Sequence, residues 1–237
     1  MRVAVVQFKA DRSDKDSSLQ TLASLARAAG PGLDLLVLPE MAATGYCFDS
    51  ALAAQTVAER PQGQTFGVFS EVAATLGAWL VVGFVEQADE GLYNSALVIQ
   101  PDGQLAFVYR KTLLFEMDTC WALAGNSGYR VFSTQRGSFT VGICMDLNDD
   151  RFLSWCALQR PTVVALPTCW LYEGYPVWHY WAYRIVPHGL SLAAANTWGL
   201  DSGVRFSGAS AIMEGAEVLA GGQQEGDVVL TAELGEL

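Results

Sequence analysis

The chain has 237 residues, of which 51% are hydrophobic and 16% charged, a balance that excludes a disordered protein and suits one large domain. Its formal net charge of −11 argues against a nucleic-acid-binding surface, which needs clustered Lys and Arg. No apolar run approaches the length of a membrane span. The five cysteines lack paired spacing, which favours reduced thiols and a cytoplasmic setting over a disulfide framework.

The first half of the chain alternates strand patterns with helical ones. Residues 17–29 have the spacing of an amphipathic helix, with Ser17 or Ser18 expected as its N-cap. A second helix is predicted over residues 64–76, where Gly77 ends it. Strands are predicted over residues 3–8, 35–38, 79–85, 93–100 and 104–109, the last two joined by a turn at Pro101-Asp102-Gly103.

The second half opens with a segment, residues 112–129, that has no clean period and is expected to be a long loop of functional interest. Helices are predicted over residues 149–159 and 176–187. Strands are predicted over residues 129–133, 138–143, 162–166, 190–195, 210–213 and 228–232. The pattern predicts one α/β domain of two or more layers over residues 1–237, without a linker or repeat.

Three polar residues stand at the ends of strand-like apolar runs: Glu40, Lys111 and Cys144. Ligands of α/β sheets bind at the carboxyl ends of strands, so we expect these side chains to share one pocket. The three groups also suit one reaction. A thiol can attack, a carboxylate can take and return a proton, and an amine can stabilise an oxyanion.

The segments around these residues carry a family resemblance. They are Pro39-Glu40 with Thr44-Gly45-Tyr46, then Tyr109-Arg110-Lys111, then Gly142-Ile143-Cys144-Met145-Asp146. In this order and spacing they resemble the nitrilase superfamily of carbon–nitrogen hydrolases. The resemblance implies a four-layer α-β-β-α sandwich and a homodimer that packs through its outer helices.

The resemblance also implies a role for each residue. Cys144 would attack a carbonyl carbon and form a thioester, and Glu40 would take the thiol proton and later activate water. Lys111 would bind the oxyanion together with the backbone N–H of Met145. No metal or organic cofactor is implied.

Two positions depart from the common family pattern. Many members carry a second glutamate eight residues after the lysine, where this chain has Thr119, and Asp118 is our candidate for the missing acid. Many also carry an arginine four residues after the cysteine, where this chain has Asn148. The stretch from Cys144 to Asn148 instead resembles the branch that includes amidases of N-terminal Asn and Gln.

The expected function is therefore hydrolysis of a linear carboxamide, on a small molecule or an N-terminal Asn or Gln, to carboxylate and ammonia. Tyr46, Trp121 and Trp170 are expected to wall the substrate pocket. Asp118 or Asp146 is expected to hold a substrate α-ammonium group.

Other functions stay open. Within the superfamily they are a nitrile hydrolase, an N-carbamoyl hydrolase and an acyltransferase, and outside catalysis a silent protein that binds a metabolite or partner. A Cys–His hydrolase is disfavoured, since the two histidines, His179 and His188, both lie in or beside the predicted 176–187 helix. No closely spaced Cys and His set suggests a zinc site.

Overall fold

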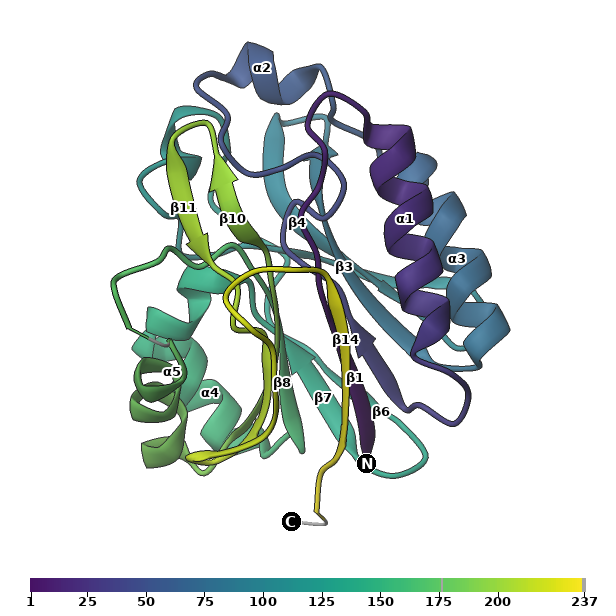
Figure 1. The fold of residues 1–237 in the computed structure, drawn as a ribbon, viewed down its shortest axis with the longest axis vertical. Helices are drawn as coiled ribbons and strands as arrows, with labels where there is room; N and C mark the ends of the chain where they lie inside the picture. Colours follow the sequence, from purple (N-terminus) through teal and green to yellow (C-terminus); the bar gives the residue numbers. More distant parts are fainter. Residues whose placement is uncertain (176, 236–237) are drawn as a thin grey trace.

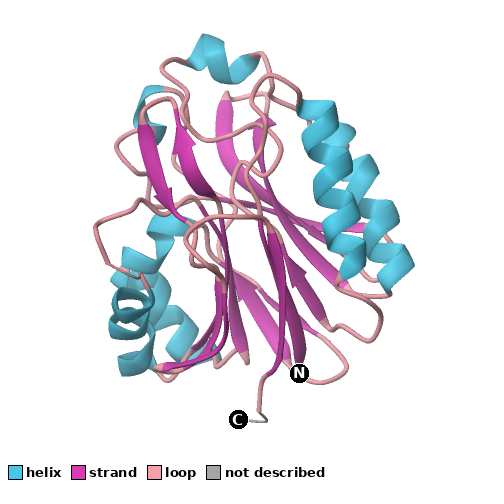
Figure 2. Ribbon diagram, in the orientation of Figure 1, coloured by secondary structure: helices cyan, strands magenta, loops and turns pink. Residues whose placement is uncertain are grey.

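Two six-stranded sheets stack face to face between two layers of helices (Figures 1 and 2). The computed structural model describes residues 1–175 and 177–235. The first sheet has the strand order β14-β1-β2-β3-β4-β5, and the second has the order β13-β12-β9-β8-β7-β6. The predicted four-layer α-β-β-α sandwich is therefore the observed architecture.

The first sheet and its helices come mainly from the first half of the chain. Strands β1, β2 and β3 pair in parallel, as strand–helix–strand connections require, whereas β3, β4 and β5 form an antiparallel meander. The elements are β1 (Arg2–Gln7), α1 (Lys15–Ala28), β2 (Leu35–Val37), α2 (Ala51–Gln55), α3 (Gln64–Leu76), β3 (Trp79–Gln87), β4 (Leu92–Ile99), β5 (Leu105–Arg110) and β14 (Val228–Glu233).

The second sheet has the same parallel centre, formed by β7, β8 and β9. Its strands are β6 (Val131–Ser133), β7 (Ser138–Val141), β8 (Val163–Thr168), β9 (Ser191–Asn196), β12 (Ala211–Glu214) and β13 (Glu217–Gly221). A separate ribbon pairs β10 (Trp198–Asp201) with β11 (Val204–Ser207). The helices are α4 (Asp150–Gln159) and α5 (Trp178–Ile185), with short 3-10 turns η1 (Asp118–Cys120), η2 (Cys144–Asn148) and η3 (Val186–His188).

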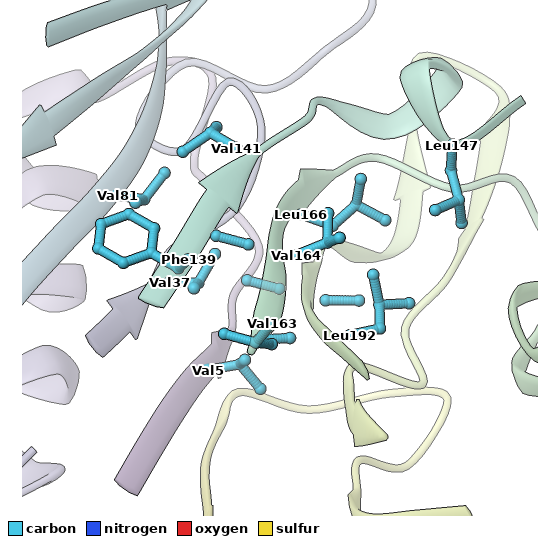
Figure 3. Close-up of a cluster of buried hydrophobic side chains, with 14 of the residues drawn as sticks. Val5, Val37, Val81, Phe139, Val141, Leu147, Val163, Val164, Leu166 and Leu192 are labelled. Atoms are coloured by element: carbon cyan, nitrogen blue, oxygen red, sulfur yellow. The ribbon is translucent and has the colours of Figure 1, made fainter. Parts of the chain in front are cut away.

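The core follows from the two-residue period of the strands. Along β1, Val3 and Val5 belong to the cluster between the sheets, whereas Ala4 and Val6 face the helices α1 and α3. Figure 3 shows part of this cluster, in which Val81 of β3 and Phe139 of β7 lie between the sheets, and the cluster continues to Val164 and Leu166 on the other face of β8. Because both faces of each central strand are covered, these strands are mostly apolar, which explains their hydrophobic runs.

The structure corrects several details of the expected elements. Helix α1 begins two residues earlier than predicted, and its N-cap is Asp14, whose carboxylate accepts from the Ser17 N–H, rather than Ser17 or Ser18. The prediction of α3 is confirmed, with Gly77 in the left-handed conformation at its end. Helix α2 and strands β10, β11 and β13 were missed. Pro176, the first residue of the predicted 176–187 helix, lies outside the described residues.

Candidate active site

The three residues singled out in the sequence come to the same end of the stacked sheets. Glu40 lies in the turn after β2, Lys111 directly follows β5, and Cys144 opens η2 just after β7. All three side chains are buried. Glu40 and Lys111 follow strands of the first sheet, and Cys144 follows a strand of the second. The site therefore lies at the interface between the two sheets.

Glu40 is fixed by the neighbouring strand β3. The chain after β2 continues along β3 through hydrogen bonds from the Gly83 N–H to the Pro39 carbonyl and from the Ala42 N–H to the Gly83 carbonyl. A Cβ atom at position 83 would lie 2.6 Å from the Glu40 Cα, a clash that only glycine avoids. The absence of a side chain at Gly83 therefore sets the depth at which Glu40 sits.

Lys111 lies between two carboxylates. Its Nζ is 2.8 Å from Oε1 of Glu40 and 2.7 Å from Oδ2 of Asp118, and none of the three side chains reaches solvent. Asn94, on β4, donates to both acids, at 2.7 Å to Glu40 and 3.1 Å to Asp118. The Tyr46 hydroxyl donates to Asp118 at 3.0 Å. Asp118 therefore supplies the second carboxylate beside Lys111, which Thr119 cannot supply because it has no carboxylate.

Cys144 has a strained backbone, with φ at +45° in the left-handed region. Asp146 stabilises this turn through hydrogen bonds. Its buried carboxylate accepts hydrogen bonds from the Ile143 N–H at 2.9 Å and the Tyr109 hydroxyl at 2.8 Å. It also accepts from the Thr112 N–H and hydroxyl and the Leu113 N–H, in the chain just after Lys111. Asp146 thus ties the Cys144 turn to the Lys111 segment.

The electrostatics of the cluster set the resting protonation states. Burial raises the pKa of Glu40, although the Lys111 charge opposes that rise. Burial alone would lower the pKa of Lys111, but Glu40 and Asp118 outweigh it and hold that pKa well above its usual value. Burial and the Glu40 charge raise the pKa of Cys144 to about 12, so the resting side chain is a neutral thiol that needs a base.

Glu40 can serve as that base. Its Oε1 already accepts from Lys111 and Asn94, whereas within the described residues Oε2 accepts only from the Cys169 N–H, at 2.7 Å. A carboxylate oxygen has two lone-pair sites, which leaves Oε2 able to accept one more proton or hydrogen bond.

A cavity of about 210 Å³ opens onto Cys144. Drug-sized ligands occupy pockets of roughly 300–1,000 Å³, so this cavity suits a small molecule or one terminal residue of a peptide. Its lining residues are Tyr46, Phe115, Cys144, Met145, Asn148, Cys169, Trp170, Leu171, Glu173, Tyr175 and Tyr180. Of the residues expected to bind substrate, Tyr46 and Trp170 therefore lie at the cavity.

Three of the expected substrate-binding residues do not line this cavity. Trp121 packs edge-on against Phe48, with ring centroids 5.5 Å apart, in a separate apolar cluster. Asp146 and Asp118 are fully buried, and their oxygens are occupied by donors of the protein itself. Neither acid lines the cavity, and the prediction that Asp118 or Asp146 binds a substrate α-ammonium stays a prediction.

The structure adds residues that sequence reasoning missed. Asn94 and the Cys169 N–H hold Glu40, and Glu173 contributes the acid at the cavity. Asn94 lies beside Ser95 in a uniformly buried strand, where buried polar residues are a usable signal. Backbone donors such as the Cys169 N–H leave no signal in a sequence. Within the described part of the chain, no group of three His, Cys, Asp or Glu side chains could hold a metal ion.

The fold and the buried carboxylate–amine–thiol cluster together define a class of α-β-β-α proteins with a cysteine at the end of a sheet. The sequence model of the carbon-nitrogen hydrolase family matches residues 2–235, and the chain belongs to this family. A protein of Pyrococcus abyssi named nitrilase is 30% identical over 99% of this chain and 89% of its own length. The protein N-terminal amidase of Schizosaccharomyces pombe is 30% identical over 76% of this chain and 78% of its own length.

Solved structures agree on the fold. An amidase from Nesterenkonia sp. has a TM-score of 0.86 at 24% identity, covering 98% of this chain and 89% of that one. An N-terminal amidase with an Asn-Glu-Ala peptide has a TM-score of 0.87 at 17% identity, covering 98% and 97%. The predictions of the superfamily, its fold and a carbon–nitrogen hydrolase are therefore confirmed. Among the residues described, no helix is long and apolar enough to cross a membrane.

Proposed function

We propose that the chain, acting as one domain over residues 1–237, hydrolyses a primary carboxamide to a carboxylate and ammonia through a thioester on Cys144. The observation that carries this proposal is the thiol opening into a small cavity beside a buried base and a buried amine. A neutral thiol with a raised pKa, next to a carboxylate with capacity for one more proton, suits attack assisted by a general base.

The proposed reaction has two halves. As the Cys144 sulfur bonds to the carbonyl carbon, its proton passes to Glu40, and Lys111 with the Met145 N–H balances the negative oxygen. Glu40 then delivers that proton to the nitrogen, the carbon–nitrogen bond breaks, and ammonia leaves a thioester. Water, deprotonated by Glu40, attacks the thioester, the carbon–sulfur bond breaks, and the thiol regains its proton as the carboxylate leaves.

The finer proposal concerns the substrate, an Asn or Gln side-chain amide with a free α-amine. The cavity is small, and the aromatic residues Tyr46 and Trp170 line it. Two relatives are named protein N-terminal amidase. We expect an Asn or Gln peptide with a free α-amine to have a higher kcat/KM than its N-acetylated form. Equal values would favour a general aliphatic amidase, and a nitrile or N-carbamoyl preference would favour the rival hydrolases.

Asp118 is proposed as a positioning residue for Lys111. Asp118→Asn should lower kcat at least about tenfold, because it removes one of the two charges that hold the ammonium in place. KM should change little, since Asp118 does not line the cavity. Glu116→Gln, on the same loop but exposed, is the matched control. An unchanged kcat in Asp118→Asn would leave Asp118 without a part in the reaction.

The pH profile tests the role of Glu40. A general base must be ionised, so kcat/KM should fall as the pH drops through the pKa of Glu40, which burial raises above its ordinary value of 4.5. Titration of Cys144, with a pKa of about 12, should add no limb near neutrality. An acid limb at or below the ordinary glutamate value, measured with a neutral amide, would contradict this assignment.

The homodimer stays a proposal. Three large apolar side chains are exposed on the outer helical layer over the second sheet: Leu158 of α4, Tyr183 of α5 and Val186 of η3. A second copy that covered them would remove this apolar surface from water.

A further inference from the structure

The cavity beside Cys144 has an asymmetric charge. Among its described lining residues, Glu173 is the single carboxylate, and none is a lysine or arginine. Lys111, proposed above to balance the oxyanion at Cys144, is buried between Glu40 and Asp118 and does not line the cavity, so it offers no positive charge to the rest of the substrate. At the position where many superfamily members carry an arginine, Asn148 is neutral and accepts a hydrogen bond from the Tyr180 hydroxyl at 2.8 Å. The cavity therefore offers nothing that would neutralise a negatively charged substrate.

Glu173 is free to bind a ligand in a way that the deeper acids are not. It lines the cavity and is exposed, as are the neighbouring Gly174 and Tyr175. Its hydrogen bond within the described residues is a long one, 3.4 Å, from the Tyr175 hydroxyl, and no basic side chain forms an ion pair with it there. By contrast, Asp118 accepts from Lys111, Tyr46, Asn94 and the Phe115 N–H.

We propose that Glu173 makes the enzyme selective for cationic substrates. Its carboxylate would bind a cationic group of the substrate, such as an α-ammonium, while the amide lies at Cys144. The proposal rests on the proposed amidase function and assigns to Glu173 the contact that the sequence had suggested for Asp118 or Asp146. A carboxylate that accepts from an ammonium group forms a charge-assisted hydrogen bond, and an anionic substrate would instead be repelled. The net charge of −11 acts in the same direction by attracting cations.

The test uses three amides of similar length that differ in their terminal group: 3-aminopropanamide (cationic), butyramide (neutral) and succinamate (anionic). The wild-type enzyme should have kcat/KM values in that order. Glu173→Gln should lower kcat/KM for 3-aminopropanamide by about fivefold, the scale of a partly exposed ion pair, and leave butyramide unchanged. Glu173→Lys should reverse the order of the two charged amides. The preference should weaken at high salt.

Glu116→Gln removes the same charge from an exposed position outside the cavity and should leave all three values unchanged. Because the Glu173 side chain accepts one long hydrogen bond within the described part of the chain, its variants should fold normally. Equal wild-type values for the three amides, or a Glu173→Gln loss that is the same for all of them, would overturn the assignment. Failure of the wild-type enzyme to hydrolyse any of the three, butyramide included, would instead contradict the proposed amidase function.

Discussion

Cys144→Ala is expected to abolish turnover of every amide substrate, because the alanine methyl group cannot form the thioester. The cavity and the Glu40–Lys111–Asp118 cluster do not depend on the sulfur, so substrate should still bind. The loss should therefore appear in kcat, measured as ammonia release, and exceed about a thousandfold.

Cys120 provides the matched control for this variant. It is an exposed cysteine on the loop that carries Asp118, and its thiol does not line the cavity. Cys120→Ala should keep normal activity. In that background iodoacetamide, itself a small primary amide, should label Cys144 and block turnover. Near-normal activity in Cys144→Ala would contradict the proposed mechanism outright.

Glu40→Gln is expected to have the second-largest effect, a fall in kcat of about a hundred- to ten-thousandfold, the usual worth of a general base. The amide group has nearly the shape of the carboxyl group, but it cannot accept a proton from a thiol whose pKa is about 12. The Glu40→Gln substitution also removes one of the two negative charges that hold the Lys111 ammonium in place. Ammonia release at substrate saturation measures the effect.

Glu86→Gln separates this effect from a general cost of neutralising a buried glutamate. Glu86 is also buried, on the neighbouring strand β3, and pairs with Arg110 at 2.6 Å and with the Ser95 hydroxyl. It does not line the cavity. Glu86→Gln should lower thermal stability while kcat stays within about twofold. A similar kcat loss in both variants would mean that Glu40 acts only through the structure.

The sequence was a good guide where local pattern and chemistry agree. Runs of apolar residues identified the central strands, and Gly77 marked the end of α3, since that position needs a left-handed residue. Glu40, Lys111 and Cys144 were singled out because they stand at the ends of strand-like apolar runs, and ligands of α/β sheets bind at the carboxyl ends of strands. The structure places them together, at the join of the two sheets.

The sequence was a poor guide where function depends on the depth and direction of a side chain. Asp146 follows Cys144 closely, but the turn at Cys144 directs its carboxylate into the interior, toward Tyr109 and Thr112. Asp118 and Thr119 are adjacent, and only the 3-10 turn η1 determines that Asp118 faces Lys111. Trp121 and Trp170 are equally aromatic, yet tertiary packing leaves only Trp170 at the cavity.

The most direct test of the central claim is the intact mass of the protein during turnover. Butyramide is mixed with the enzyme, the reaction is stopped in acid within one turnover, and the mass is measured. We predict a species heavier by the mass of the amide minus that of ammonia, located on Cys144 by peptide mapping and absent from Cys144→Ala. Ammonia release from the wild-type enzyme with no such species, even when acid quenching is fast enough to trap a thioester, would contradict covalent catalysis by Cys144.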